Sequence, residues 1–329
     1  LSLFQLSTGM AIVLLTGTLN RVMVVELGQG TSLVSLMLAI PLLLAPARAL
    51  IGYRSDHHRS YLGWRRIPYL WSGTLMQFGG LAFMPFALIL MIEPHSGPAI
   101  IGPIAAMGAF LLTGLGMHVS QTAGLALATD LATEETRPRV VALLYLMLLV
   151  GMISSAVIFA ALLDDFSYVR LIQVIQSAAV ITLILNVAAM WKQEVRHPEL
   201  TDHKREKPTF GSAWGEFINL PKARRLLWAL GLGTMGFTMQ DILLEPYGAH
   251  VLGLSVSETT LLTALFAGGM VLALLMTSRT LRKGVDPIRL ASVGVLIGIV
   301  AFVAVILSAP LQSTGLFQIG ATLIGVGNG

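Results

Sequence analysis

The sequence predicts an all-α integral membrane protein, and three observations carry that prediction. Of the 329 residues, 55% are hydrophobic and only 12% are charged, whereas a soluble domain has about 25% charged residues. The mean hydropathy is +0.79. Apolar runs of about 20 residues, the length that crosses a bilayer, recur along the whole chain. The chain has no cysteine, which excludes disulfides, thiolate metal sites and cysteine nucleophiles.

Ten runs qualify as membrane spans. In order, they cover residues 3–26, 32–51, 66–92, 99–129, 138–163, 168–191, 224–245, 256–279, 287–308 and 312–329. The chain opens inside an apolar run, and its last run reaches Gly329 without a polar exit. We therefore expect the complete protein to be longer at both ends.

The connections between spans alternate in charge. Even-numbered loops and their flanks hold 19 of the 21 lysine and arginine residues, while odd-numbered loops are acidic or neutral. The positive-inside rule then predicts that the even-numbered loops are cytoplasmic. All five tryptophans fall near the same face, as interfacial aromatic residues do. The pI of 9.6 is thus a topology signal, and we expect a lipid bilayer and no nucleic acid as a partner.

An internal repeat divides the chain. The end of the first span aligns with the end of the seventh, so that Arg21 matches Gln240 and Glu26 matches Glu245. Six spans, a polar linker and four further spans indicate duplicated halves. The predicted domains are an N-terminal six-helix bundle (1–191), a cytoplasmic linker (192–223) and a truncated C-terminal bundle with its first four spans (224–329).

The linker contains a predicted amphipathic helix. Phe210, Trp214, Phe217 and Ile218 recur at helical spacing. This pattern suits a helix that lies on the cytoplasmic leaflet, and it suits equally a soluble helix packed against the bundle ends.

Ionisable residues inside spans are the first candidates for function, because each costs about 2.5–3.5 kcal/mol to insert. Arg21 and Asp241 are the two clear cases. We predict an inter-bundle polar network of Arg21, Asp241, Gln240, Glu26 and Glu245. The alternative is pairing within each half, for example of Arg21 with Glu26, although residues five apart are poor neighbours on an α-helix.

The second loop contains a glycine, an aspartate four residues later, and then a basic run with another glycine. This spacing resembles the loop signature of the major facilitator superfamily, with an insertion at residues 57–62. The aspartate is expected to pair with basic groups and close the cytoplasmic side in one state. With the fourth-to-fifth loop, the predicted cytoplasmic gate comprises Gly52, Asp56, Arg59, Arg65, Arg66, Asp130 and Arg137. The positive-inside charge bias by itself explains the arginines, but it does not explain the spacing of the glycine and the aspartate.

The fourth span contains a candidate pigment ligand. His118 is the one histidine well inside a span, and Gln121 follows it by one turn. A neutral imidazole can hold the magnesium of a flat pigment as an axial ligand, and nearby glycines leave room for a macrocycle. The alternative, which the residues alone favour, is a buried histidine bonded to a helix carbonyl or to Gln121. We predict no other metal site.

Catalytic motifs are absent from the sequence. There is no Walker phosphate loop, no HExxH, no GxSxG and no cysteine–histidine cluster. The adjacent pair Asp164 and Asp165 lies in a short outer loop. We therefore expect no enzyme activity.

Four long stretches, residues 17–28, 49–69, 116–144 and 240–256, look like the PucC/LhaA family. This family is the bacteriochlorophyll-delivery branch of the major facilitator superfamily in phototrophic bacteria. The resemblance implies a major facilitator fold of two six-helix bundles, with about twelve spans in the full protein, of which ten are covered here. It also implies a bacterial inner or intracytoplasmic photosynthetic membrane. It raises the expectation that His118 binds pigment, while the lipid-facing surface stays open as the other pigment site.

The function that the resemblance implies is assembly of the light-harvesting antenna. Such a protein binds bacteriochlorophyll, with carotenoid as a further pigment, delivers it to the light-harvesting alpha and beta subunits, and chaperones ring assembly. The core-ring branch is slightly preferred. Further partners are the reaction centre–antenna complex and the machinery of pigment synthesis or insertion. The alternative is a secondary transporter that moves a small solute by alternating access.

Overall fold

A computed structural model describes residues 1–92, 98, 100–196 and 209–329. Within these ranges the side chains of Leu226, Leu230, Met239, Asp241, Arg282 and Pro287 are outside the description. The regular structure in the described ranges is entirely helical. In chain order the elements are α1 (Leu3–Ile12), the π-helical segments η1 (Val13–Leu19) and η2 (Val22–Glu26), α2 (Thr31–Leu43), α3 (Ala47–Asp56), α4 (Ile67–Ile92), α5 (Ile101–Leu131), α6 (Arg137–Leu162), α7 (Tyr168–Met190), α8 (Phe210–Ile218), α9 (Pro221–Leu252), α10 (Val256–Arg282), α11 (Pro287–Ser308) and α12 (Thr314–Asn328).

Helices form at all ten positions that the sequence predicts, which confirms the all-α prediction. Within the described ranges, eight helical segments are long and apolar enough to cross a membrane, so the chain is a multi-pass membrane protein. These segments are Leu3–Glu26, Thr31–Asp56, Ile67–Ile92, Ile101–Leu131, Arg137–Leu162, Tyr168–Met190, Val256–Leu281 and Ile288–Ser308. α9 and α12 are also helical, but over their described residues they do not meet both the length and the hydropathy that a membrane span needs.

The first two spans are not continuous α-helices. η1 and η2 widen the first span into π-helix, in which a backbone N–H bonds to the carbonyl five residues earlier, as Leu27 does to Val22. The second span breaks between α2 and α3, where Pro46 has no N–H for the carbonyl of Leu42. The Ala45 N–H donates a hydrogen bond to that carbonyl instead.

Helix ends in the C-terminal part follow local sequence. Ser255 and Glu258 form a capping box at the start of α10, each side chain accepting the other's backbone N–H. Before it, Gly253 ends α9 with φ +67°, a conformation that glycine adopts without strain. This turn presents the backbone carbonyl of Leu254 to the first span.

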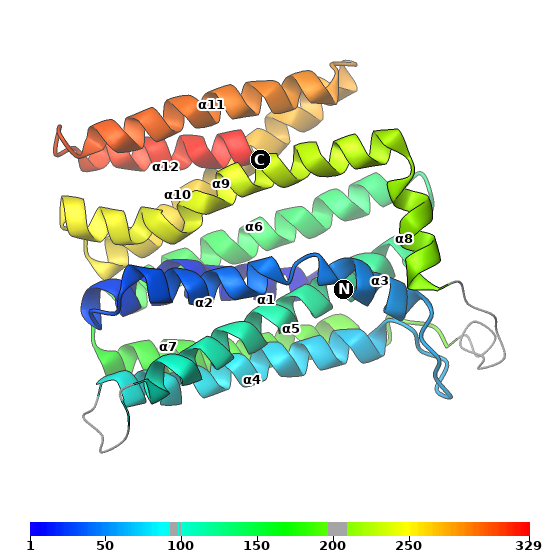
Figure 1. Ribbon diagram of the computed structural model, residues 1–329, viewed down its shortest axis with the longest axis horizontal. Coiled ribbons are helices and arrows are strands. Elements are labelled where there is room, and N and C mark those ends of the chain that lie inside the picture. The colour runs from blue at the N-terminus through cyan, green and yellow to red at the C-terminus, as the bar shows by residue number, and fades with distance from the viewer. Residues whose placement is uncertain (93–97, 99, 197–208) are drawn as a thin grey trace. The chain divides into compact units, whose positions relative to one another are not determined.

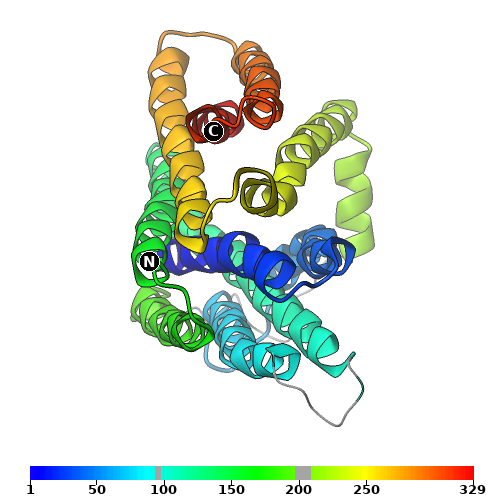
Figure 2. The same ribbon diagram turned by 90° about the vertical axis from the view of Figure 1, so that its left-hand side faces the viewer.

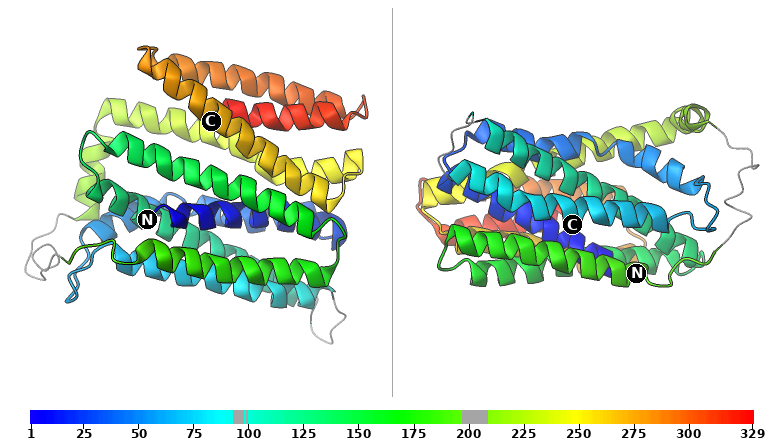
Figure 3. Two further views of the ribbon diagram at one scale, coloured as in Figure 1. Left: turned by 180° about the vertical axis from the view of Figure 1, so that it is seen from behind. Right: turned by 90° about the horizontal axis from the view of Figure 1, so that it is seen from below.

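The described chain divides into two compact units. Unit 1 comprises Leu1–Thr8, Leu36–Met147 and Ile175–Gly231. Within it α4 and α5 lie side by side (Figures 1 and 3). Gly73 makes this possible, because a Cβ there would lie 2.7 Å from the backbone nitrogen of Ser120 and 2.8 Å from the Gly116 carbonyl oxygen.

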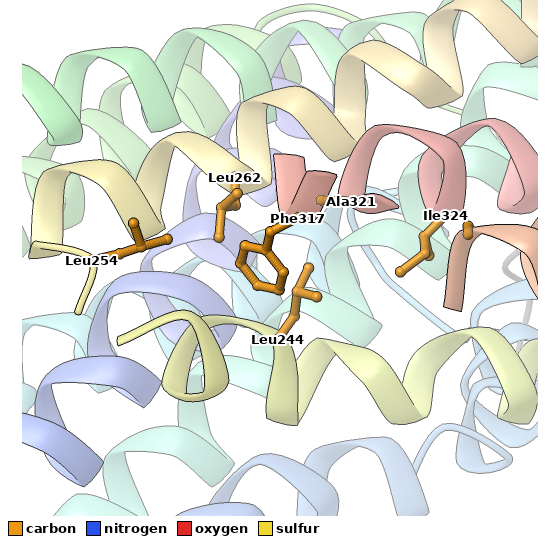
Figure 4. Packing of buried hydrophobic residues seen from close by; sticks show 7 residues of the cluster. Leu244, Leu254, Leu262, Phe317, Ala321 and Ile324 are labelled. Atoms are coloured by element: carbon orange, nitrogen blue, oxygen red, sulfur yellow. The ribbon is translucent and has the colours of Figure 1, made fainter. Parts of the chain in front are cut away.

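Unit 2 comprises Gly9–Ser35, Leu148–Val174 and Leu232–Gly329. Within it α12 packs against both α10 and α11 (Figure 2). The apolar core of this unit gathers Leu244 of α9, Leu262 of α10 and the fully buried ring of Phe317 of α12 (Figure 4). The two units do not follow the predicted domain limits, and the division into bundles at 1–191 and 224–329 stays a prediction.

Candidate functional site

An ion pair between a buried arginine and a partly exposed glutamate lies at the π-helical end of the first span, in unit 2. The Arg21 side chain is 6% exposed and pairs with Glu26, while its Nη2 donates to the Leu254 carbonyl at 3.2 Å. Residues five apart are poor neighbours on an α-helix, but η2 wraps the chain into a wider turn and brings Glu26 beneath Arg21. The π-helical geometry is therefore what makes this intrahelical pair possible.

Further polar contacts tie the first span to helices from the C-terminal half of the sequence, all inside unit 2. The Asn20 amide donates to the Ile242 carbonyl of α9 at 2.9 Å. The hydroxyls of Thr18 and Thr260 share a hydrogen bond of 3.3 Å. The side chain of Asp241 lies outside the described residues, so its predicted pairing with Arg21 stays a prediction.

Glu245 of α9 is a buried carboxyl group, only 3% exposed. It accepts a hydrogen bond of 2.5 Å from the Thr263 hydroxyl of α10. On the other side it faces Gly17, where a Cβ would lie 2.6 Å from Glu245 Oε1. Glycine at this position thus leaves the space that the carboxyl group occupies.

A small cavity of about 60 Å³ adjoins Glu245. A water molecule needs about 10–15 Å³ of such volume, so the cavity has room for a few waters. Its lining residues come from the first span and from α6, α9 and α10: Ile12, Thr16, Met152, Gln240, Leu244, Glu245, Leu262, Thr263 and Phe266. Of the predicted polar network, the structure thus brings Gln240 and Glu245 to one cavity and joins Arg21 to Glu26. The role of these residues between bundles stays a prediction.

His118 of α5 bonds to a carbonyl on a neighbouring helix, in unit 1. Its Nε2 lies 2.9 Å from the Pro41 carbonyl oxygen. That carbonyl is available because Ala45, its expected donor, bonds to Leu42 at the Pro46 break. Since a carbonyl only accepts, Nε2 carries the hydrogen and the lone pair stays on Nδ1. Nδ1 is enclosed and has no hydrogen-bond partner among the described residues.

Gln121, the other predicted pigment residue, bonds elsewhere. Its amide donates to Gln5 Oε1 of α1 at 3.3 Å. Next to it, Arg48 Nε donates to the Thr122 hydroxyl at 3.1 Å, and that hydroxyl donates to the His118 carbonyl. The imidazole of His118 therefore has a helix carbonyl as its partner. Whether His118 holds pigment magnesium stays a prediction.

A cluster of charges surrounds Arg66 at the start of α4. The Arg66 side chain is 6% exposed. Its guanidinium pairs with Asp56 and with Asp130 at 3.2 Å, and it donates to the Ser55 hydroxyl at 2.7 Å. Arg65 adds a weaker contact to Asp130 at 3.4 Å. Four of the predicted gate residues therefore lie together, joining three separate segments of unit 1.

Glu194 completes this cluster, and sequence reasoning missed it. Its carboxylate accepts hydrogen bonds from the backbone N–H groups of Arg65, Arg66 and Ile67, at 2.8 to 3.1 Å. These groups form the N-terminus of α4, where orphan donors and the helix dipole favour a negative charge. The available signal was a single acid between Lys192 and Arg196 in the chain.

Three predicted gate residues lie apart from the Arg66 contacts. Gly52 faces Thr122, and a Cβ there would make an ordinary 3.7 Å contact, so alanine would fit. Arg137 Nε donates to the Thr129 carbonyl at 3.3 Å. Arg59 is exposed in the loop after α3. The gating role of all seven residues stays a prediction.

Larger hollows are apolar and open. A groove of about 510 Å³ lies between the start of α4 and the end of α7, and another of about 660 Å³ follows α7. A third, of about 330 Å³, lies between α9 and α11. Among the described residues, no group of three or more histidine, aspartate or glutamate side chains could hold a metal ion.

Comparisons with known proteins agree with the predicted family. A family model described as "PUCC protein" matches residues 18–329. The chain is 52% identical to "Protein PucC" of Rhodovulum sulfidophilum over 335 residues, covering all of this chain and 74% of the relative. It is 54% identical over 332 residues to an "Uncharacterized protein in puhA-bchM intergenic region" of Rhodobacter capsulatus, covering all of this chain and 69% of the relative.

The fold is that of the major facilitator superfamily. The chain superposes on the partially occluded, inward-open xylose transporter XylE of E. coli with a TM-score of 0.65 at 13% sequence identity. The superposition covers 99% of this chain and 82% of the transporter. At this identity the likeness concerns the fold alone, and it confirms the predicted architecture class.

Proposed function

Because the chain belongs to the PucC family, we propose that it takes part in the biogenesis of the photosynthetic antenna. In this proposal it binds bacteriochlorophyll and delivers the pigment to the light-harvesting alpha and beta subunits while their ring assembles. Its role is to bind and position, without catalysing a reaction. Carotenoid, the reaction centre–antenna complex and the pigment-insertion machinery are the further proposed partners.

The proposal rests on the difference in volume between the cavity at Glu245 and the apolar grooves on the helices. Sites for small molecules usually measure about 300–1,000 Å³. The cavity at Glu245 has about 60 Å³, too little for a solute larger than a few waters. The apolar grooves along α7 and between α4 and α7 reach about 660 and 510 Å³. A small internal cavity and large apolar grooves suit an amphiphile with a long apolar tail better than a water-soluble solute.

The protonation state of His118 suits a ligand of pigment magnesium, but its free ring nitrogen is not accessible to a pigment. With Nε2 bonded to Pro41, the Nδ1 lone pair is the one available to a magnesium ion. Since Nδ1 is enclosed, pigment can reach it only after the surrounding chain moves. The break at Pro46 already lacks a backbone N–H, so movement there costs less backbone hydrogen bonding than movement inside a continuous helix.

Location follows from the same proposal. The protein would lie in the bacterial photosynthetic membrane, with the Arg66 cluster and the other basic loops in the cytoplasm. The charge asymmetry of the loops supports this orientation.

A second candidate function rests on Glu245. A buried ionisable group in a membrane span is a functional hypothesis by default, and secondary transporters use such groups for coupling. Transport of a small solute by alternating access is therefore the alternative. It would require the 60 Å³ cavity to enlarge in another state.

Pigment analysis of the protein, purified gently from its native membrane, separates the two candidates. The proposal expects near-infrared bacteriochlorophyll absorption in the purified protein, with small antenna polypeptides co-purifying. His118→Ala should lower the pigment content if His118 is a ligand, and His250→Ala, at the far end of α9, serves as the control. A colourless, partner-free protein in mild detergent would contradict the proposal and favour the transporter.

A further inference from the structure

The groove between the start of α4 and the end of α7 is lined by aromatic side chains. Trp64, Trp71 and Trp191 contribute to it, together with Met190 and Ile67. Trp191 is 68% exposed and Trp71 is 44% exposed. Large exposed indole rings suit the boundary between hydrocarbon and headgroups, because the ring is apolar and its N–H is polar.

This groove continues along α7 into a neighbouring hollow. The neighbouring hollow is lined by Leu183, Ile184, Val187, Ala188 and Trp191, and it shares Val187 and Trp191 with the first. From Leu183 to Trp191 the helix rises by about 12 Å at 1.5 Å per residue. One leaflet of a bilayer is about 15 Å of hydrocarbon, half of the whole core. The groove therefore matches the depth of a single leaflet.

The headgroup end of the groove is basic. Lys192 lines it, and the Arg196 guanidinium lies 4.9 Å from the centroid of the Trp64 ring. Glu194 lines it too, but its carboxylate is bonded to the N-terminus of α4. The helix N-terminus offsets part of the negative charge of Glu194. Beside it, the mouth of the groove presents two exposed cations above an apolar channel.

We propose that this groove, lined by residues of α4, α7 and the segment 191–196, is a binding site for one anionic phospholipid. The acyl chain lies along α7 between Leu183 and Trp191, and the phosphate meets Lys192 and Arg196. This groove is one of the hollows that support the proposed function, so the assignment rests on that function and names an anionic lipid as an amphiphile that the groove holds. Its test uses no pigment, so it can fail separately from the pigment proposal. The assignment also gives the tryptophans at this end a specific ligand.

Native mass spectrometry of the delipidated, detergent-purified protein tests this assignment. The probes are phosphatidylglycerol and phosphatidylcholine with the same acyl chains, added separately. Wild-type protein should bind the first phosphatidylglycerol more tightly than phosphatidylcholine. Two basic groups near a membrane surface account for a factor of about 10 or more. The double variant Lys192→Gln/Arg196→Gln should lose this preference, and Trp191→Ala should weaken binding of both lipids.

Matched controls come from the start of α9. Arg224→Gln/Arg225→Gln removes two exposed cations, and Trp228→Ala removes an indole that is 69% exposed, as Trp191 is 68% exposed. Neither control should change the affinity for the first bound lipid molecule. Thermal melting should show that all variants are folded. Equal affinity for the two lipids, or an equal loss in variants and controls, would overturn the proposal.

Discussion

Replacing Glu194 by glutamine tests how the charge cluster at the start of α4 is built. Two carboxylate oxygens of Glu194 receive four hydrogen bonds from three backbone N–H groups. Glutamine keeps one accepting oxygen and places an NH2 group where the second one was. Two of the four bonds are lost, and the negative charge at the helix N-terminus disappears with them.

The expected cost follows from these bonds. A hydrogen bond to a charged group contributes about 1.5–3 kcal/mol when buried, and removal of a helix cap costs about 0.5–2 kcal/mol. Glu194 is half-buried, so water replaces part of the loss. We expect a decrease of about 1–2 kcal/mol in the free energy of unfolding, or roughly 1.5–3 °C in Tm for a chain of this length.

Intrinsic tryptophan fluorescence during thermal unfolding in detergent measures this change, because Trp64 and Trp191 lie beside Glu194 in the same groove. Glu216→Gln, an exposed residue of α8, is the control and should stay within about 0.5 kcal/mol of wild type. If Glu194→Gln melts at the wild-type temperature, Glu194 does not cap α4 and the reasoning fails.

Three further substitutions test the packing and the polar contacts by thermal unfolding. Gly73→Ala should destabilise by about 1–3 kcal/mol because its Cβ meets α5 backbone; Gly79→Ala, with 3.7 Å to its nearest neighbour, should not, and equal melting would refute the close approach. Thr263→Val should cost about 1–3 kcal/mol by removing a donor to buried Glu245, while Thr238→Val, whose hydroxyl bonds within α9, is the control. Arg66→Lys should cost about 1–2 kcal/mol, since lysine lacks the planar fork and the partner carboxylates are 48% and 38% exposed; an unchanged Tm would contradict the three-way contact.

Most of the helix positions could be predicted, because hydrophobic length alone specifies them. The break in the second span depends on Pro46, which is visible in the sequence. The effect of the break on a distant helix is not visible there. It frees the Pro41 carbonyl for His118, which is 77 residues away in the chain. Sequence reasoning offered a helix carbonyl as one partner for this histidine without identifying which.

The candidate sites were predicted in part. Asp56, Arg65, Arg66 and Asp130 could be selected from charge and spacing, and they do lie together. Glu194 and Thr263 could not be, because an acid between two basic residues and a hydroxyl on a helix do not identify a partner on another segment. The pairing of Arg21 with Glu26 looked unfavourable only because the spacing was judged on an α-helix, whereas this stretch is π-helical.

Near-infrared absorption of membranes is the most direct test of the central claim. A phototrophic strain that lacks its own PucC family gene would be complemented with the gene that encodes this chain. The account predicts that antenna absorption returns, together with antenna polypeptides in the membrane. If the protein accumulates in the membrane and the antenna bands do not return, the proposed role in antenna biogenesis is contradicted.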